Sequence, residues 1–268
     1  GLRLTPEPQR SAMYVVYAWM RAADDLADAE GFAPDERVRR IADFRSATDE
    51  ALAGRPRPGD HVWRALAWVA SSHGLSAREF HDMLDGQLAD VGPARYETWD
   101  DLRSFCYRVA STVGLVSIKV WGYRDPAAPA LAVDRGIAFQ LTNILRDVRE
   151  DHDLGRTYLP AEDFRRFDLT PERLRRWQEP AQCAEFVRAQ CDRAEQFYNC
   201  QHVLMGCCTN LLDFYGRLGV RDAIEWHRRI HWANPPHRPD PMEPGVLPAP
   251  MHFSGSFAAM RFLGMASK

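Results

Sequence analysis

Apolar residues recur with the helical spacing of three to four positions through most of residues 5–232. No segment alternates apolar and polar β-branched side chains as a half-buried strand does. Pro6 and Pro8 fall where a first helix would start, and Gly31 falls just after its expected end, which is the usual placement of these two residue types. The pattern therefore predicts an all-α protein.

Further breaks divide the rest of the chain into helices. Pro34 opens a second helix, and Ser76 with Glu79 three positions later has the spacing of a capping box. Small residues inside the apolar stretch at 98–121 indicate close packing or the wall of a tunnel. After Pro160, short helical pieces come before a longer amphipathic region. The predicted helices cover residues 34–53, 60–73, 76–90, 98–121 and 127–153, with the amphipathic region at 181–232.

The end of the chain differs from the rest in composition. Seven prolines lie between positions 235 and 250, and no helical pattern accompanies them. No break of this kind occurs earlier. We therefore expect a single helical domain over residues 1–233, followed by a proline-rich C-terminal arm at residues 234–268.

Composition excludes some functions. A net charge of −3 lacks the basic surface expected for nucleic-acid binding. The six cysteines form no CxxC pair and have no zinc-ligand spacing, so reduced thiols in a cytoplasmic protein are expected. No signal peptide and no stretch long enough to span a bilayer are present, so any membrane contact would be peripheral. The sequence does not indicate an oligomeric state.

Two short acidic runs are the most informative chemical feature. One contains Asp24, Asp25 and Asp28, and the other contains Asp147 and Asp151. Residues four apart share a helix face, so each run places carboxylates side by side, where like charges repel. The first run also ends a helix, where acids oppose the macrodipole by about 0.3–1 kcal/mol each. Mg²⁺ would relieve this crowding, since it is usually held by one or two carboxylates together with substrate phosphate oxygens. The runs predict a diphosphate-binding site.

The second run continues a longer polar stripe. Gln140, Asn143, Asp147 and Asp151 are three, four and four positions apart, so they follow one helix face between apolar flanks. Uncharged amides on such a helix indicate a polar cavity, where they can bind phosphate or metal-bound water. Arg156 follows the helix and could reach a diphosphate from the metal side.

Three ordered segments resemble the squalene/phytoene synthase family: residues 13–28, 106–114 and 140–160. The resemblance covers about residues 4–175 and fades afterwards. It implies an all-α isoprenoid-synthase fold around a central cavity, with the two acidic runs facing each other across its mouth. It also implies that two prenyl diphosphates are joined head to head through a cyclopropylcarbinyl diphosphate. The predicted cofactor is Mg²⁺, with two or three ions expected.

The resemblance assigns roles to individual residues. Metal ligands would be Asp24, Asp28, Asn143, Asp147 and Asp151, and the four aspartates would be catalytic together with Arg21, Tyr17 and Tyr107. Substrate would contact Arg21, Gln140, Asn143, Arg146, Arg156, Tyr158, Val109 and Gly114. A carbocation needs a dry apolar pocket, with expected walls at Tyr17, Tyr107, Val109, Ala110, Val113, Gly114, Leu115 and Phe139, each of which also fits ordinary helix core.

Some positions depart from the family pattern. Ser111 stands where the family commonly has glycine, which would narrow the cavity. Tyr215 is the candidate for a cavity tyrosine late in the family sequence. Residues from Gly1 onward do not include the Ser or Asn followed by Phe-Tyr that family members carry ahead of the first helix.

The product stays open between squalene and phytoene types, that is, between farnesyl and geranylgeranyl diphosphate as substrate. NADPH also stays open, because the reductive members of the family lack a glycine-rich fingerprint as well. A hydroxysqualene synthase is one alternative, although Ile144-Leu145-Arg146 favours an enzyme that makes the squalene- or phytoene-type product. A non-catalytic assembly factor is another, against which the two complete acidic runs argue. The amides ahead of Asp147 argue against a chain-elongating or cyclising enzyme.

Overall fold

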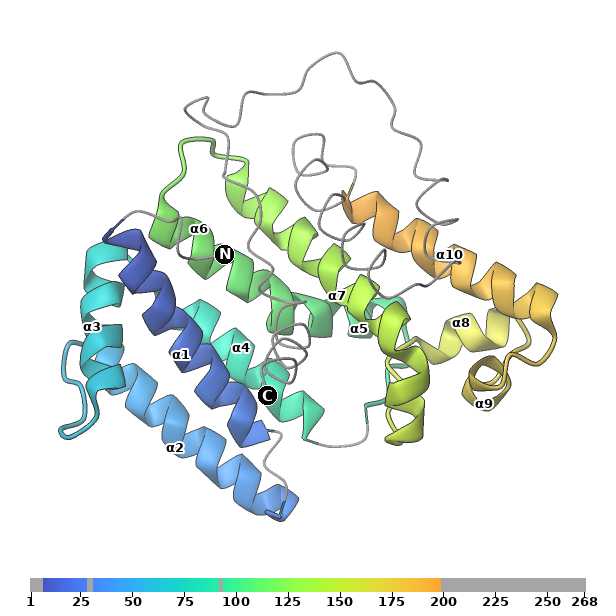
Figure 1. Cartoon of the computed structure of the whole chain (residues 1–268), viewed down its shortest axis with the longest axis horizontal. Coiled ribbons are helices and arrows are strands. Elements are labelled where there is room, and N and C mark those ends of the chain that lie inside the picture. Colours follow the sequence, from blue (N-terminus) through green and yellow to red (C-terminus); the bar gives the residue numbers. More distant parts are fainter. Residues whose placement is uncertain (1–6, 28–30, 92–93, 199–268) are drawn as a thin grey trace, which may run out of the picture.

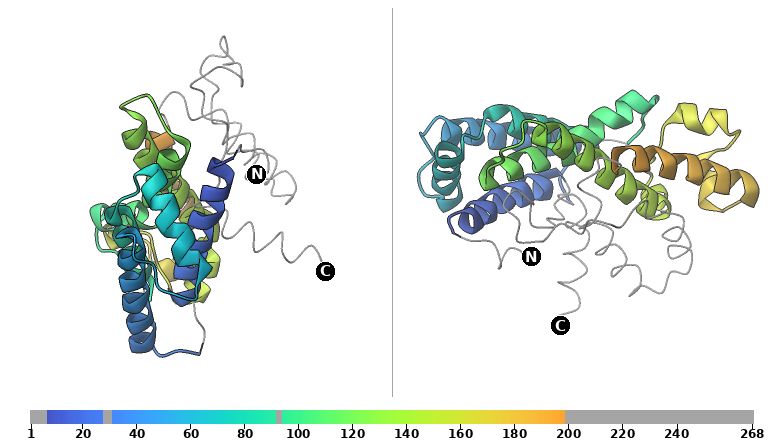
Figure 2. Two further views of the ribbon diagram at one scale, coloured as in Figure 1. Left: turned by 90° about the vertical axis from the view of Figure 1, so that its left-hand side faces the viewer. Right: turned by 90° about the horizontal axis from the view of Figure 1, so that it is seen from above.

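The regular structure of the described residues is helical, as the sequence predicts (Figures 1 and 2). The computed structural model describes residues 7–27, 31–91 and 94–198. The predicted C-terminal arm, Asp28 and Tyr215 lie outside these ranges. The helices in chain order are α1 (Gln9–Ala27), α2 (Pro34–Leu52), α3 (His61–His73), α4 (Ala77–Asp90), α5 (Trp99–Cys106), the π-helical η2 (Tyr107–Ser111), α6 (Thr112–Trp121), α7 (Ala128–Asp153), α8 (Ala161–Arg166), α9 (Pro171–Arg175) and α10 (Pro180–Tyr198).

Local sequence explains several helix ends. Asp60 accepts a hydrogen bond from the backbone N–H of Val62 at 2.8 Å and so caps the start of α3. Gly74 ends that helix with φ of 61°, which glycine adopts without steric cost. A full capping box forms at α5, where the Thr98 and Asp101 side chains each bond the other's backbone N–H.

The capping box predicted at α4 does not form. Ser76 is the N-cap residue, but its hydroxyl donates to the Glu79 carboxylate and not to the backbone. Glu79 is buried and also accepts from the Lys119 ammonium of α6. The Glu79–Lys119 ion pair between α4 and α6 therefore replaces the local cap. A buried carboxylate without a cationic partner costs more free energy than a helix N-terminus without a side-chain cap.

The apolar stretch at 98–121 forms three consecutive helical segments, with η2 between α5 and α6. π-Helical turns are rare and occur often at functional sites. Gly136 of α7 makes room for this one, since a Cβ there would lie 2.5 Å from the Ser111 backbone nitrogen. Ser111 is fully buried, and its hydroxyl donates to the Val133 carbonyl at 2.7 Å. Its side chain thus joins η2 to α7, which is a packing role that the cavity-narrowing prediction did not anticipate.

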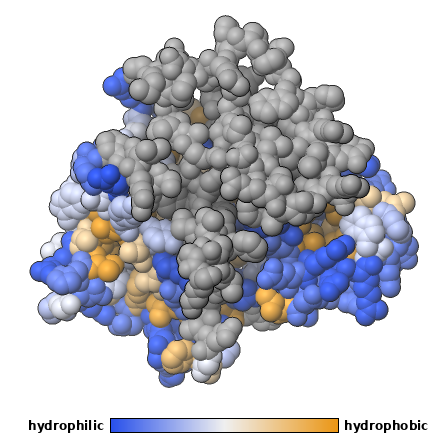
Figure 3. Space-filling model, viewed as in Figure 1, coloured by the Kyte–Doolittle hydropathy of each residue, from blue (hydrophilic) through white to orange (hydrophobic). Residues whose placement is uncertain are grey.

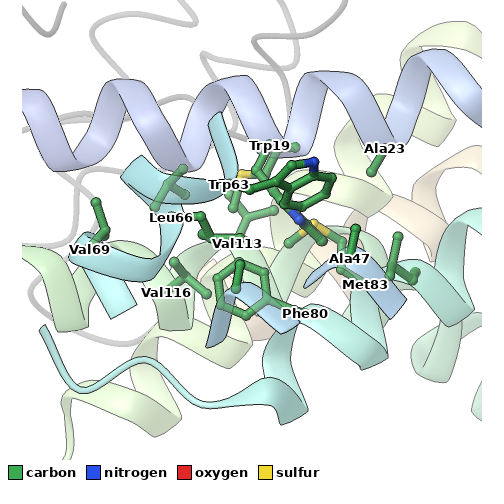
Figure 4. Packing of buried hydrophobic residues seen from close by; sticks show 14 of the residues in the cluster. Trp19, Ala23, Ala47, Trp63, Leu66, Val69, Phe80, Met83, Val113 and Val116 are labelled. Atoms are coloured by element: carbon green, nitrogen blue, oxygen red, sulfur yellow. The ribbon is translucent and has the colours of Figure 1, made fainter. Parts of the chain in front are cut away.

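A tryptophan anchors α1 in one of the two hydrophobic clusters (Figure 4). The Trp19 ring meets Phe80 of α4 edge to face, with centroids 4.7 Å apart. Its indole N–H donates to the Thr48 hydroxyl of α2 at 2.9 Å. This buried contact satisfies the polar atom of the ring and joins α1 to α2.

The other cluster gathers around α7, where Leu141 and Ile144 pack with Phe105 of α5 and with α8–α10. α6 packs against both α1 and α7. The C-terminal ends of α1 and α7, which carry the two acidic runs, lie toward the same lower side of the molecule in Figure 1. The fold therefore places both runs on one side, on different helices.

The visible surface mixes apolar and hydrophilic side chains (Figure 3). Tyr14, Trp68 and Leu154 are among the larger apolar side chains that are exposed. No helix in the described ranges combines the length and the apolar character needed to cross a bilayer.

Candidate active site

The polar stripe of α7 lies on one helix face, as its spacing predicts. Gln140, Asn143, Asp147 and Asp151 are all half-buried on this continuous helix. Burial, followed by the nearby charge of Asp147, raises the pKa of Asp151 to about 7. Nearby positive charge therefore does not fully offset burial and repulsion at Asp151, which is the electrostatic setting that a divalent cation would relieve.

Two arginines flank these carboxylates. Arg146 donates to both oxygens of Asp147, through Nε at 2.7 Å and Nη2 at 2.5 Å. The positive charge of Arg156 opposes the rise in the pKa of Asp151. A small cleft beside the end of α7 is lined by both Asp151 and Arg156. The Arg156 guanidinium could bind diphosphate oxygens, and Arg146 could do so through N–H groups other than the two that donate to Asp147.

The acidic end of α1 carries its own arginine. Arg21 lies 3.5 Å from an oxygen of Asp24 and 2.7 Å from an oxygen of Asp25. These i,i+3 and i,i+4 pairs reduce the cost of acids near the helix C-terminus. Arg21 thus pairs with two aspartates of this acidic run, and Asp28 lies outside the described residues.

The predicted cavity residues have mixed surroundings. Tyr17 is half-buried on α1. The Tyr107 hydroxyl donates to Asp82 of α4 at 3.2 Å. Val109 packs against Gly86 of α4, where an added Cβ would meet it at 2.8 Å. An added Cβ at Gly114 would lie 3.1 Å from the Ala132 carbonyl of α7, so its missing side chain serves close helix packing.

Asp90 also lies in this region, although neither acidic run contains it. It is the last residue of α4, and it accepts a hydrogen bond of 2.6 Å from the hydroxyl of Tyr158, a predicted substrate contact. Its charge also contributes to raising the pKa of Asp151. A signal was present in the sequence, because an acid at a helix C-terminus is unfavourable unless something offsets it.

The described residues fit Mg²⁺ as part of a site and not as a complete cage. Within residues 7–27, 31–91 and 94–198, no three His, Cys, Asp or Glu side chains come together closely enough to hold a metal alone. Mg²⁺ needs fewer protein ligands, because water and substrate phosphate supply the rest. Asp147 and Asp151 offer hard oxygen donors whose mutual repulsion a cation would relieve.

Comparison with known proteins gives relatives that are phytoene synthases. A phytoene synthase of Pseudescherichia vulneris is 38% identical over 200 residues, which are 72% of this chain and 64% of that protein. A 15-cis-phytoene synthase of Synechococcus elongatus is 35% identical over 212 residues, 74% of this chain and 67% of that protein. The chain thus spans about two thirds of these relatives, and about half of the carrot phytoene synthase.

Solved structures give the same result for the fold. A dehydrosqualene synthase in complex with ligand aligns with a TM-score of 0.66 and 31% identity, covering 78% of each chain. The squalene synthase HpnC from Alicyclobacillus acidocaldarius aligns with a TM-score of 0.67 and 27% identity, covering 73% of this chain and 72% of that one. Residues 1–231 match the Squalene/phytoene synthase family as a whole. The chain belongs to the squalene/phytoene synthase family.

Proposed function

We propose that this protein condenses two molecules of geranylgeranyl diphosphate head to head to give a phytoene-type product, with Mg²⁺ as cofactor. The observation that carries the proposal is the α7 stripe, in which Asp147 and Asp151 crowd two negative charges beside Arg146 and Arg156. When bound, Mg²⁺ would neutralise the diphosphate oxygens and make them a better leaving group.

The chain's own residues would bind the leaving group and exclude water. Arg146 and Arg156 would bind phosphate oxygens, and Arg21 would do the same from α1. Gln140 and Asn143 would orient the diphosphate or its water shell through their amides. Tyr17 and Tyr107 would present aromatic faces to an allylic cation. Asp24, Asp28 and Asn143 would complete the metal ligands with the α7 carboxylates.

Relatives of both product types support a head-to-head reaction. The similar curated proteins are phytoene synthases, which favours the longer substrate. The similar solved structures are squalene and dehydrosqualene synthases, so farnesyl diphosphate is the second candidate substrate. A large hydrocarbon product would leave toward lipid, and peripheral membrane contact in the cytoplasm is part of the same proposal.

The test is turnover by the full chain. The protein is incubated with geranylgeranyl or farnesyl diphosphate and Mg²⁺, with and without NADPH, and the extracted products are identified by mass. We expect a forty-carbon hydrocarbon from geranylgeranyl diphosphate, with no requirement for NADPH. A thirty-carbon product alone would reassign the substrate, and no product from a folded protein would refute the proposal.

A matched pair of variants tests the role of the stripe. Asp147→Asn should lower kcat at least about a hundredfold, because a lost electrostatic contact to the leaving group costs roughly that much. Asp153→Asn is the control, since this exposed carboxylate on the same helix pairs with Arg175 at 2.8 Å. Equal activity of the two variants would show that the stripe does not bind the reacting diphosphate.

A further inference from the structure

Asp90 contacts two residues of the turn that follows α7. Its Oδ1 accepts a hydrogen bond from the Tyr158 hydroxyl at 2.6 Å, and its Oδ2 lies 3.8 Å from Nη1 of Arg156. About one fifth of the Asp90 side chain is exposed, at 21%. A carboxylate with little solvent depends on such partners, so these contacts define where Asp90 lies.

The backbone of this turn is fixed at both sides of Arg156. The Arg156 N–H donates to the Asp151 carbonyl at 2.8 Å, and the Thr157 N–H donates to the Ala94 carbonyl at 3.1 Å. The long Arg156 side chain keeps several rotatable bonds, and neither backbone contact fixes them. A contact at the guanidinium is therefore what decides its direction.

Tyr158 fixes the carboxylate in turn. Its ring is buried and stacks on Phe105 with centroids 5.4 Å apart and on Tyr96 with centroids 6.2 Å apart. Burial, and then the charge of Asp90, raise the pKa of Tyr158, so the hydroxyl keeps its proton and remains a donor. A rigid aromatic stack thus holds one oxygen of Asp90 and leaves the other toward Arg156.

Arg156 lies in the field of two carboxylates, Asp90 and Asp151. If residue 90 were neutral, Asp151 would attract the Arg156 guanidinium more strongly than residue 90 would. A guanidinium paired with Asp151 would compete with Mg²⁺ for the oxygens of that carboxylate, as Arg146 already does at Asp147. The charge of Asp90 thus competes with Asp151 for Arg156.

We infer that Asp90 is a positioning residue that holds Arg156 away from Asp151, so that Arg156 faces the diphosphate and Asp151 stays available to the metal. This inference rests on the proposed function for the identity of the bound groups. Asp90 acts through the two residues that it contacts and not on the reacting atoms.

The test is a double-mutant cycle read out by metal binding without substrate. Mn²⁺ is titrated calorimetrically into the full-length wild type, Asp90→Asn, Arg156→Gln and the double variant. Asp90→Asn should weaken Mn²⁺ binding. Arg156→Gln should strengthen Mn²⁺ binding in both backgrounds, and the factor by which it does so should be at least about fivefold larger in Asp90→Asn than in the wild type. Additive effects would overturn the inference, because they would mean that Asp90 acts only by its own charge or as a ligand.

Two further variants separate positioning from folding. Tyr158→Phe keeps the aromatic stack and removes one bond to Asp90, so it should weaken Mn²⁺ binding in the same direction but less. Asp85→Asn, on the same helix, loses an ion pair to Arg45 and should leave Mn²⁺ binding unchanged. An equal loss in Asp85→Asn, or no Mn²⁺ binding by the wild type, would overturn the inference. If the protein turns over prenyl diphosphate but the effects of the two substitutions are additive, only the role of Asp90 is overturned. If the effects are coupled but the protein shows no turnover, only the proposed function is overturned.

Discussion

Replacing Asp151 with asparagine should stabilise the metal-free protein above neutral pH. Burial and the charge of Asp147 raise the pKa of this carboxyl from 3.8 to about 7. An acid whose pKa is raised on folding contributes stability below its unfolded pKa, and that contribution is lost as the pH rises through the folded pKa. Above pH 7 the ionised Asp151 therefore costs folding free energy, and asparagine removes that cost while keeping the shape.

The size of the effect follows from the two pKa values. A difference of roughly three units, at about 1.36 kcal/mol each, sets an upper value of about 4 kcal/mol at pH 8. Solvent reaches part of this half-buried carboxyl, and screening reduces the expected gain to about 2 kcal/mol. For a protein of this length, that gain corresponds to a rise in Tm of roughly 4–8 °C.

The assay is thermal and urea unfolding of wild type and Asp151→Asn in the presence of EDTA, at pH 8 and at pH 4. The variant should be clearly more stable at pH 8 and within about 0.5 kcal/mol of wild type at pH 4, where Asp151 is protonated in the folded state and only about half ionised in the unfolded state. In an Asp147→Asn background, Asp151→Asn should gain less at pH 8 than it does in the wild type, because part of the repulsion is already removed.

An exposed carboxylate on the same helix serves as the control. The pKa of Asp153 is lowered, mainly by its hydrogen bonds to Arg175, so Asp153→Asn should bring no gain at pH 8. If Asp151→Asn were no more stable than wild type at pH 8, or gained as much at pH 4, the charge-crowding argument would be wrong. Mg²⁺ with pyrophosphate should stabilise the wild type and have much less effect on the variant.

Two structural predictions concern the parts that position the site. Burial favours a higher pKa for Asp163, but hydrogen bonds from Arg193 and Gln190 outweigh it and lower the pKa. The stability that ionised Asp163 contributes should be complete above about pH 4 and lost below that pH. Asp163→Ala should cost roughly 3 kcal/mol of unfolding free energy at pH 7, measured by urea unfolding. Gly136→Ala should lower the free energy of unfolding by at least about 2 kcal/mol, because its Cβ would lie 2.4 Å from the Ser111 Cα. Ser111→Ala should lower it by only about 1 kcal/mol, for the lost hydrogen bond to Val133. Equal costs would show that close packing at Gly136 does not limit stability.

Helical periodicity was enough to predict an all-α protein, because the apolar stripes of α1 and α7 reflect the two clusters that they bury, whereas the particular fold was implied by the family resemblance. Periodicity did not reveal the π-helical turn at η2, since that turn depends on the room that Gly136 leaves about 25 residues away. The prediction of a capping box at Ser76 was wrong for a similar reason, because Lys119 from another helix pairs with the Glu79 carboxylate. Contacts between distant residues decide both cases, and local spacing does not contain them.

The α7 stripe was predicted in full because it lies on one helix, whereas Asp90 was missed because its partners follow it by some 65 residues. Both sites obey the same rule of helix electrostatics. Asp90 ends α4 and Asp151 lies in the last turn of α7, so each carboxylate opposes its own helix dipole. Such a placement costs stability in the isolated helix and is offset for Asp90 by Arg156 and Tyr158. For Asp151 the offset is incomplete, which leaves uncompensated negative charge that a divalent cation would relieve.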